Sequence, residues 1–264
     1  MSIAHTLAPS GGAVEVVIPA RMASTRLPRK MLLAETGKPL IQHTYEAAAT
    51  ARSARSVRVA TDHEAIAEAV HRFGGCVEMT DPGVASGTDR VAEVARRIED
   101  ARIVVNVQGD EPEVAGASID LAVRLLETHA DAAMATVATP IRRRALLEDP
   151  ACVKVVFDAQ GRALYFSRSP IPHPRQWHDS LFEVEPPLFY QHIGLYAYRR
   201  DFLLGLARLP QCATERTESL EQLRVLHSGY PILVGIVAEA FGGIDTADDY
   251  AAFVARHRRL RRAG

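Results

Sequence analysis

Short apolar runs alternate, in the first half of the chain, with segments in which apolar residues recur every three or four positions. The runs predict strands at 14–18, 57–60, 76–79 and 103–107. The periodic segments predict helices at 40–52, 62–73, 91–98 and 119–126. The last strand is almost wholly apolar, as expected for a parallel strand buried on both faces, and Asp62 is expected to cap the second helix. Strands separated by helices of this length predict βαβ units in a doubly wound α/β sheet.

The pattern changes after about residue 150. Two strand-like runs, 153–157 and 163–167, flank a short turn containing Gly161, which predicts an antiparallel hairpin. Residues 170–187 hold five prolines and little periodicity, so we expect a long loop there. Further elements are predicted as strands at 193–198 and 232–237 and as helices at 218–227 and 246–262. We expect a flexible tail at 1–13 and one α/β domain at 14–264, with an antiparallel insertion at about 150–190.

Composition and charge exclude several classes of protein. The 264 residues carry a formal net charge of −1, which argues against general nucleic-acid or membrane-surface binding. The basic stretch at 256–264 lacks aromatic platforms and is expected to be the exposed end of a helix. No apolar run approaches the ~20 residues that span a membrane, and the first residues lack the features of a signal peptide, so we expect a cytoplasmic protein. The three cysteines are widely spaced and indicate neither disulfides nor a zinc site: Cys76, Cys152 and Cys212.

A cationic loop, VIPARMASTRLPRK at 17–30, follows the first predicted strand. It places four positive charges within ten residues, without an acid among them: Arg21, Arg26, Arg29 and Lys30. Arg can bind phosphate oxygens in a bidentate manner and Lys acts as a point charge. Ligands of α/β sheets bind outside the carboxyl ends of the strands, so this position favours a nucleoside triphosphate over a merely solvated basic loop. The chain has no GxxxxGK[ST] or GxGxxG motif, so side chains must supply much of the counter-charge.

Carboxylates follow two other apolar segments. Asp110 and Glu111 lie in NVQGDEP, where Gly109 is expected to allow a sharp turn after the strand that exposes both carboxylates at the same rim as the cationic loop. Asp245 lies in GGIDTADDY. Beside a triphosphate, such carboxylates indicate Mg²⁺, which takes oxygen ligands and bridges phosphates. The alternative for the second segment is that Asp245 or Thr246 caps the last helix.

Taken together, these segments resemble the 3-deoxy-manno-octulosonate cytidylyltransferases, also called CMP-Kdo synthetases. Matching blocks occur in family order over about residues 14–250, so the resemblance covers nearly the whole chain. The blocks are IPARMASTRLPRK, VATDHE, SGTDR, VNVQGDEP, KVVFD, ALYFSRSPIP, HIGLYAYR, ESLEQLR and GIDTADDY. The resemblance implies a Rossmann-like nucleotidyltransferase fold, a doubly wound mixed sheet with a smaller antiparallel dimerisation region, and therefore a homodimer. The implied activity transfers CMP from CTP to the anomeric hydroxyl of the acidic sugar Kdo, releasing pyrophosphate, for lipopolysaccharide synthesis.

The resemblance also implies roles for particular residues. Contacts to the nucleotide would come from Arg21, Ser24, Arg26, Lys30 and Gln108. Mg²⁺ would be held by Asp110 and Asp245, which would carry the catalysis together with Arg21 and Lys30. The sugar pocket would be lined by Arg168, His192, Tyr196, Glu221 and Gln222. Arg168 is the expected partner of the sugar carboxylate, whereas the other four could also be scaffold or a solvated helix face.

Two departures from the family pattern stand out. PRK replaces the usual PGK, so Arg29 replaces a glycine and is expected to add a charge near the phosphates; TADDY replaces TPEDL and leaves Asp245 intact. One alternative function is a cytidylyltransferase for another acidic sugar, such as a sialic, pseudaminic or amino-substituted Kdo substrate. Another is a nucleotide-binding regulator that has lost its chemistry, which predicts the loss of Lys30, Asp110 or Asp245. All three residues are present.

Overall fold

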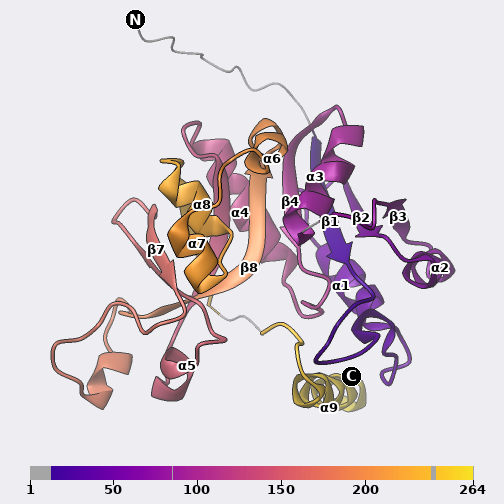
Figure 1. The fold of residues 1–264 in the computed structure, drawn as a ribbon. Helices are drawn as coiled ribbons and strands as arrows, with labels where there is room; N and C mark the ends of the chain where they lie inside the picture. The colour runs from indigo at the N-terminus through magenta and orange to yellow at the C-terminus, as the bar shows by residue number, and fades with distance from the viewer. Residues whose placement is uncertain (1–12, 85, 239–241, 264) are drawn as a thin grey trace, which may run out of the picture.

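The computed structural model describes residues 13–84, 86–238 and 242–263, with side chains described as far as residue 259 in the last helix. A mixed β-sheet runs through the molecule, with helices on both of its faces (Figure 1). In the described residues the sheet has nine strands, seven of them in the order β3–β2–β1–β4–β8–β5–β9. The predicted tail at 1–13 lies outside the described residues except for Ala13, which already belongs to the first strand.

The first half of the chain forms the parallel part of the sheet. Its strands are β1 (Ala13–Ala20), β2 (Ser56–Thr61), β3 (Cys76–Met79) and β4 (Ala101–Val107). The 3₁₀ helix η1 (Lys30–Leu32) follows the cationic loop. The α-helices are α1 (Leu40–Ala48), α2 (Glu64–Arg72), α3 (Gly87–Arg97) and α4 (Gly116–Thr128). β1 pairs in parallel with both β2 and β4, so the carboxyl ends of these strands meet at one edge.

The second half adds the antiparallel strands that make the sheet mixed. Its strands are β5 (Met134–Pro140), β6 (Lys154–Phe157), β7 (Ala163–Ser167), β8 (Tyr190–Arg199) and β9 (Ile232–Ile236). Its helices are α5 (Arg144–Glu148), η2 (Asp179–Phe182), α6 (Arg200–Leu206), α7 (Ala213–Glu218), α8 (Gln222–His227) and α9 (Ala247–Ala263). β8 runs antiparallel to β4 and β5, whereas β5 and β9 are parallel. The hairpin of β6 and β7 joins the sheet where Lys154 pairs with Gln191 of β8.

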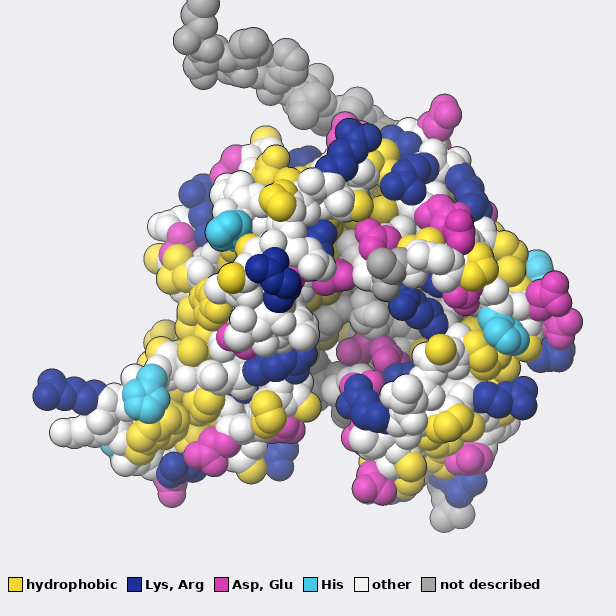
Figure 2. Space-filling model, in the orientation of Figure 1, with side chains coloured by type: hydrophobic (Ala, Val, Ile, Leu, Met, Phe, Trp, Pro, Cys, Tyr) yellow, Lys and Arg dark blue, Asp and Glu magenta, His cyan; other side chains and the backbone are white. Residues whose placement is uncertain are grey.

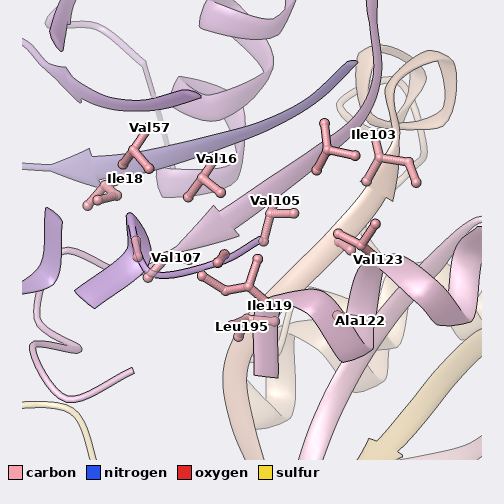
Figure 3. Packing of buried hydrophobic residues seen from close by; sticks show 14 of the residues in the cluster. Val16, Ile18, Val57, Ile103, Val105, Val107, Ile119, Ala122, Val123 and Leu195 are labelled. Carbon is pink, nitrogen blue, oxygen red and sulfur yellow. The ribbon is translucent and has the colours of Figure 1, made fainter. Parts of the chain in front are cut away.

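The core fills both faces of the sheet, as the apolar run of β4 predicts. Ile103 and Val105 point to the face covered by α1, α2 and α4 (Figure 3), whereas Val104 belongs to the cluster on the other face, beneath α3, α6 and α8. Successive strand residues point to opposite faces, so a strand that is buried on both sides is apolar at most positions, with the buried Asn106 as the exception in β4. The core thereby fixes the carboxyl ends of β1 and β4 beside one another.

The structure confirms the predicted hairpin and the doubly wound mixed sheet, and it corrects several boundaries. β5 was not predicted, and the helix predicted at 218–227 begins only at Gln222, because Ser219 has the left-handed φ of 53° and ends α7. The helix predicted at 40–52 ends at Ala48. Asp62 does not cap α2: the His63 ring accepts from the backbone N–H of Ala65, and Asp62 pairs instead with Arg90. None of the described helices is long and apolar enough to cross a membrane.

Candidate active site

A turn at the carboxyl end of β4 brings the NVQGDEP segment against the start of the cationic loop. Thr44 of α1 donates to the Gly109 carbonyl at 2.8 Å, and the turn closes through a bond from Glu111 N–H to the Gln108 carbonyl. A Cβ on Gly109 would lie 2.9 Å from the Pro19 carbonyl oxygen and 3.0 Å from the Met31 sulfur. The glycine is therefore required for close packing between the two segments, and not for the positive φ that a sharp turn would need.

Lys30 joins the three predicted segments of the site. Its ammonium group donates to Asp110 Oδ2 at 2.6 Å, to the Ile244 carbonyl at 2.7 Å and to Asp245 Oδ1 at 3.3 Å. Its side chain is only 8% exposed, so these charged contacts form largely away from water. Lys30 has three N–H donors, and each has an acceptor here. In this arrangement Lys30 neutralises the carboxylates directly, and a triphosphate would have to share it with them.

The start of α9 places Asp245 opposite the cationic loop. Ile244 and Tyr250 pack with Leu27 of the loop in a small apolar cluster, and Ile244 N–H donates to the Asp110 carbonyl at 2.9 Å. Thr246 accepts from Asp249 N–H at 3.2 Å, while the Asp249 carboxylate accepts from Thr246 N–H at 2.8 Å. This reciprocal cap belongs to Thr246 and Asp249, so Asp245 is left to face the site.

A cavity of about 370 Å³ lies between these segments. It is lined by all seven residues that sequence analysis assigned to the nucleotide and metal: Arg21, Ser24, Arg26, Lys30, Gln108, Asp110 and Asp245. Arg26 reaches Asp245 at 3.1 Å, but both side chains are about half exposed or more, so this pair is weak. The cavity combines exposed guanidinium groups with carboxylates, as a site for a metal-bound polyphosphate requires.

Asp110 and Asp245 fit a Mg²⁺ site that is completed by a substrate. Both carboxylates approach the same ammonium group, so their oxygens converge on one point. Mg²⁺ is usually held by one or two carboxylates together with waters and substrate phosphates. No cluster of three or more His, Cys, Asp or Glu ligands was found in the described part of the chain. The donor set therefore suits a cation that arrives with phosphate better than a permanent structural metal.

Glu111 is not the exposed rim carboxylate that its position after the strand suggests. Burial raises the pKa of Glu111 to about 8, and the charges of Asp110 and Asp245 add to the rise. The half-buried Glu111 lines the larger cavity described below. The two carboxylates were predicted to share one exposed rim; the alternation of side chains along an extended segment is the signal in the sequence that neighbouring residues point differently.

A second, larger cavity of about 850 Å³ adjoins the first. The two cavities share Arg26, Gln108, Asp110 and Asp245. The larger one is lined by all five residues assigned to the sugar: Arg168, His192, Tyr196, Glu221 and Gln222. Figure 2 shows the molecule hollowed between the part that carries α5 and β7 and the part that carries α1 and α9, with acidic and basic side chains along the hollow. Two ligands could therefore meet at the shared carboxylates.

His192 is a neutral hydrogen-bonding group and not an acid or base at neutral pH. Its Nε2 lies 3.0 Å from the Thr136 hydroxyl, which donates to the Leu195 carbonyl at 2.7 Å. With that hydroxyl hydrogen committed, we assign the ring proton to Nε2, which leaves Nδ1 as an acceptor. Burial lowers the pKa of His192 to about 3, so the ring stays uncharged.

The polar groups at the end of α7 and the start of α8 come from the break at Ser219. Gln222 is 4% exposed and its Nε2 has no hydrogen-bond partner among the residues that the structure describes. Glu221 is exposed and pairs with the Thr88 hydroxyl of α3. A buried amide donor without a partner is costly, so a cavity wall that holds one suits a polar ligand with an acceptor.

Arg29 does not add its charge to the phosphate cavity, contrary to the expectation from sequence. It has the left-handed φ of 56°, which favours glycine, and its side chain lines a separate surface cavity with Arg72 and Gln42. Arg29 lies immediately before η1 and is not among the residues that line the phosphate cavity. The position therefore accommodates an Arg without bringing it to the site.

At the ends of its strands, the doubly wound sheet presents a cationic loop opposite two convergent carboxylates. These features define a nucleotide-binding transferase of the α/β class. Comparison with known families gives the particular one: residues 15–234 match the family model described as cytidylyltransferase, and the chain belongs to that family.

Individual relatives are similar over most of their length. The chain is 49% identical to a 3-deoxy-manno-octulosonate cytidylyltransferase of Rhodopirellula baltica, over 91% of this chain and 97% of the relative. It is 44% identical to an 8-amino-3,8-dideoxy-manno-octulosonate cytidylyltransferase of Shewanella woodyi, over 92% of this chain and 98% of the relative. A solved CMP:2-keto-3-deoxy-manno-octonic acid synthetase in complex with CTP is 40% identical, with a TM-score of 0.87 and coverage of 94% of this chain and 99% of that one.

Proposed function

We propose that this protein transfers CMP from CTP to the anomeric hydroxyl of Kdo and releases pyrophosphate, providing activated sugar for lipopolysaccharide synthesis. The observation that carries the proposal is the meeting of two cavities at Asp110 and Asp245. One is lined by the cationic loop, and the other by the Arg168 guanidinium together with uncharged and acidic hydrogen-bonding side chains. The names of the relatives at 49% and 40% identity support the same substrates. The retained Lys30, Asp110 and Asp245 favour an enzyme over a regulator that has lost its chemistry.

The proposed reaction is a displacement at the α-phosphorus of CTP. A bond forms between this phosphorus and the acceptor oxygen, whose proton passes to water. The bond to the α,β-bridging oxygen breaks, and pyrophosphate leaves with that oxygen. Arg21, Arg26 and Lys30 would hold the phosphates and offset their charge, and positioning of the two substrates supplies most of the remaining acceleration. Mg²⁺ held by Asp110 and Asp245 would polarise the α-phosphate and lower the pKa of the acceptor hydroxyl. His192 Nδ1 and Gln222 Nε2 would orient the sugar.

A second candidate acceptor is the amino-substituted sugar named for the relative at 44% identity. Asp149 and Glu221 line the larger cavity and could accept from an ammonium group of such a sugar. The candidates differ only in the acceptor, so a single assay separates them.

The test measures pyrophosphate release with CTP, ATP, GTP or UTP against Kdo, 8-amino-3,8-dideoxy-manno-octulosonate or N-acetylneuraminate, with and without Mg²⁺. We expect release with CTP, Kdo and Mg²⁺. A higher kcat/KM with the amino sugar would establish the second candidate, whereas turnover with N-acetylneuraminate and none with Kdo would refute the acceptor assignment.

The metal assignment has its own test. Asp110→Asn should slow pyrophosphate release about 100-fold or more, because one carboxylate of the cation site is lost. Asp248→Asn is the matched control: Asp248 is exposed in the first turn of α9 and does not line either cavity. Full activity in Asp110→Asn would refute the metal role.

We also propose that the protein is a cytoplasmic homodimer that forms through the β6–β7 region. Leu164 of β7 is 61% exposed, and Leu188 shortly before β8 is 39% exposed, so apolar surface remains there for a second copy. Light scattering after gel filtration should give twice the monomer mass, and Leu164→Glu should lower it. A monomer at micromolar concentration would contradict this assembly.

A further inference from the structure

A fully buried cation, Lys154, lies at the start of β6 behind the wall of the larger cavity. Its side chain is 0% exposed. The ammonium group donates to the carbonyls of Asp149 at 3.0 Å, of Cys152 at 2.6 Å, and of Arg168. Within the described part of the chain no carboxylate lies at ion-pair distance from it. Removing an ammonium group from water is expensive, and here the three backbone carbonyls supply the direct contacts that compensate it.

Each of the three carbonyls belongs to a residue that lines the larger cavity. Asp149 and Cys152 lie on either side of Pro150, and the Pro150 carbonyl accepts from Arg168 Nη1 at 3.0 Å. Lys154 therefore holds Arg168 at two ends. It binds the backbone carbonyl of Arg168 directly, and it also binds the short loop whose Pro150 carbonyl accepts from the Arg168 guanidinium.

Glu218, the last residue of α7, completes this support. Its carboxylate accepts from the backbone N–H of Arg168 at 2.8 Å and from the Ser167 hydroxyl at 2.7 Å. Its carbonyl accepts from Arg168 Nε at 2.7 Å. α7 and α8 lie beside β7 (Figure 1), so the support comes from a helix end packed on the hairpin. Three of the five N–H donors of a guanidinium remain for a ligand, and they are held in one orientation.

We propose that Lys154 is the positioning residue for Arg168 and thereby sets the affinity for the carboxylate of the acidic acceptor. The inference rests on the proposed function, because it needs an acidic sugar in the larger cavity. Lys154 does not touch that sugar. It fixes the loop and strand end that hold the guanidinium, and its buried charge adds positive potential where an anion binds.

The experiment compares Lys154→Met, which keeps most of the length of the side chain and removes the charge, with wild type. The acceptor KM in the pyrophosphate assay and the Kd for CTP without acceptor are measured for each. We expect the acceptor KM to rise between about tenfold and hundredfold, the effect of misplacing a binding group, while the Kd for CTP changes less than about twofold. Lys38→Met is the matched control, since Lys38 lies on the surface and pairs with Glu46.

A second measurement distinguishes positioning of Arg168 by Lys154 from a purely structural role of Lys154. In an Arg168→Ala background, Lys154→Met should raise the acceptor KM little further, because residues that act through one another are not additive. An additive effect, or equal losses for CTP and acceptor, would overturn the inference. If Lys154→Met does not fold, Lys154→Gln, which removes the charge but keeps a hydrogen-bond donor, serves the same comparison and should raise the acceptor KM selectively; an unchanged KM in that variant would also overturn the inference.

Failure of the proposed function is visible separately, in the wild-type protein. If none of the acidic sugars supports pyrophosphate release by the wild-type protein, the proposed function is refuted, and this inference with it. Wild type that turns over an acidic sugar, together with an unchanged acceptor KM in Lys154→Met, refutes this inference alone.

Discussion

Replacing Lys30 by Met removes the positive charge that joins the three segments of the active site. The variant keeps a side chain of similar length but loses the bonds to Asp110, Asp245 and the Ile244 carbonyl. The two carboxylates would then face each other without a counter-charge, close to Glu111. We expect both the stability of the fold and the rate of pyrophosphate release to fall.

The size of the stability loss follows from the exposure of each contact. The Asp110 bond is short and its partners are 8% and 27% exposed, so it should contribute about 2 kcal/mol as a charged hydrogen bond. The Asp245 carboxylate is 49% exposed, and its contact should contribute less than about 1 kcal/mol. The bond to the Ile244 carbonyl should add about 1 kcal/mol. The total loss in the free energy of unfolding is then about 3 kcal/mol. For a chain of this size, such a loss lowers Tm by roughly 10 °C.

Thermal unfolding with and without Mg²⁺ checks this estimate, and Lys38→Met again serves as the control for loss of a lysine. Mg²⁺ should raise the Tm of Lys30→Met more than that of wild type, because it would replace the missing charge. Pyrophosphate release should fall about 100-fold or more in the variant. A Tm within about 2 °C of wild type, or an undiminished rate, would show that Lys30 is not the electrostatic centre of the site.

Three further outcomes are expected from the structure. Arg29→Gly should stabilise the fold by about 1 kcal/mol through relief of the left-handed backbone and leave turnover within about twofold; slower turnover would place Arg29 back in the phosphate site. Gly109→Ala should destabilise by about 1–3 kcal/mol, since its Cβ would lie 2.9 Å from the Pro19 carbonyl oxygen, and unchanged urea unfolding would refute this packing role. His192 has a folded-state pKa of about 3 against about 6.5 when unfolded, so the unfolded chain binds the extra proton. Stability should therefore fall as pH drops below about 6.5, by up to about 1.4 kcal/mol per pH unit, and His192→Gln should remove that part of the slope in urea unfolding at pH 7.5 and 5.5.

Local pattern predicted most of the first half of the fold because strands there are continuous and helices are periodic. It missed β5, where Thr136 and Thr139 interrupt an otherwise apolar segment. It also missed α7 and started the next helix at residue 218 in place of Gln222, because nothing in the residue type of Ser219 signals a positive φ. Both errors concern the second half, in which strand pairing between distant segments, more than local periodicity, fixes the structure.

The sequence by itself determined which groups are available for chemistry: a cationic loop after one strand, carboxylates after another, and a third carboxylate before the last helix. Parallel strands end at a common edge, so even their neighbourhood could be predicted. Only the tertiary structure decided how the charges are used. Lys30 is committed to the carboxylates, Arg29 points to another cavity, and the buried Lys154 supports Arg168. Burial and side-chain direction depend on packing between segments far apart in the chain, and no local pattern encodes that packing.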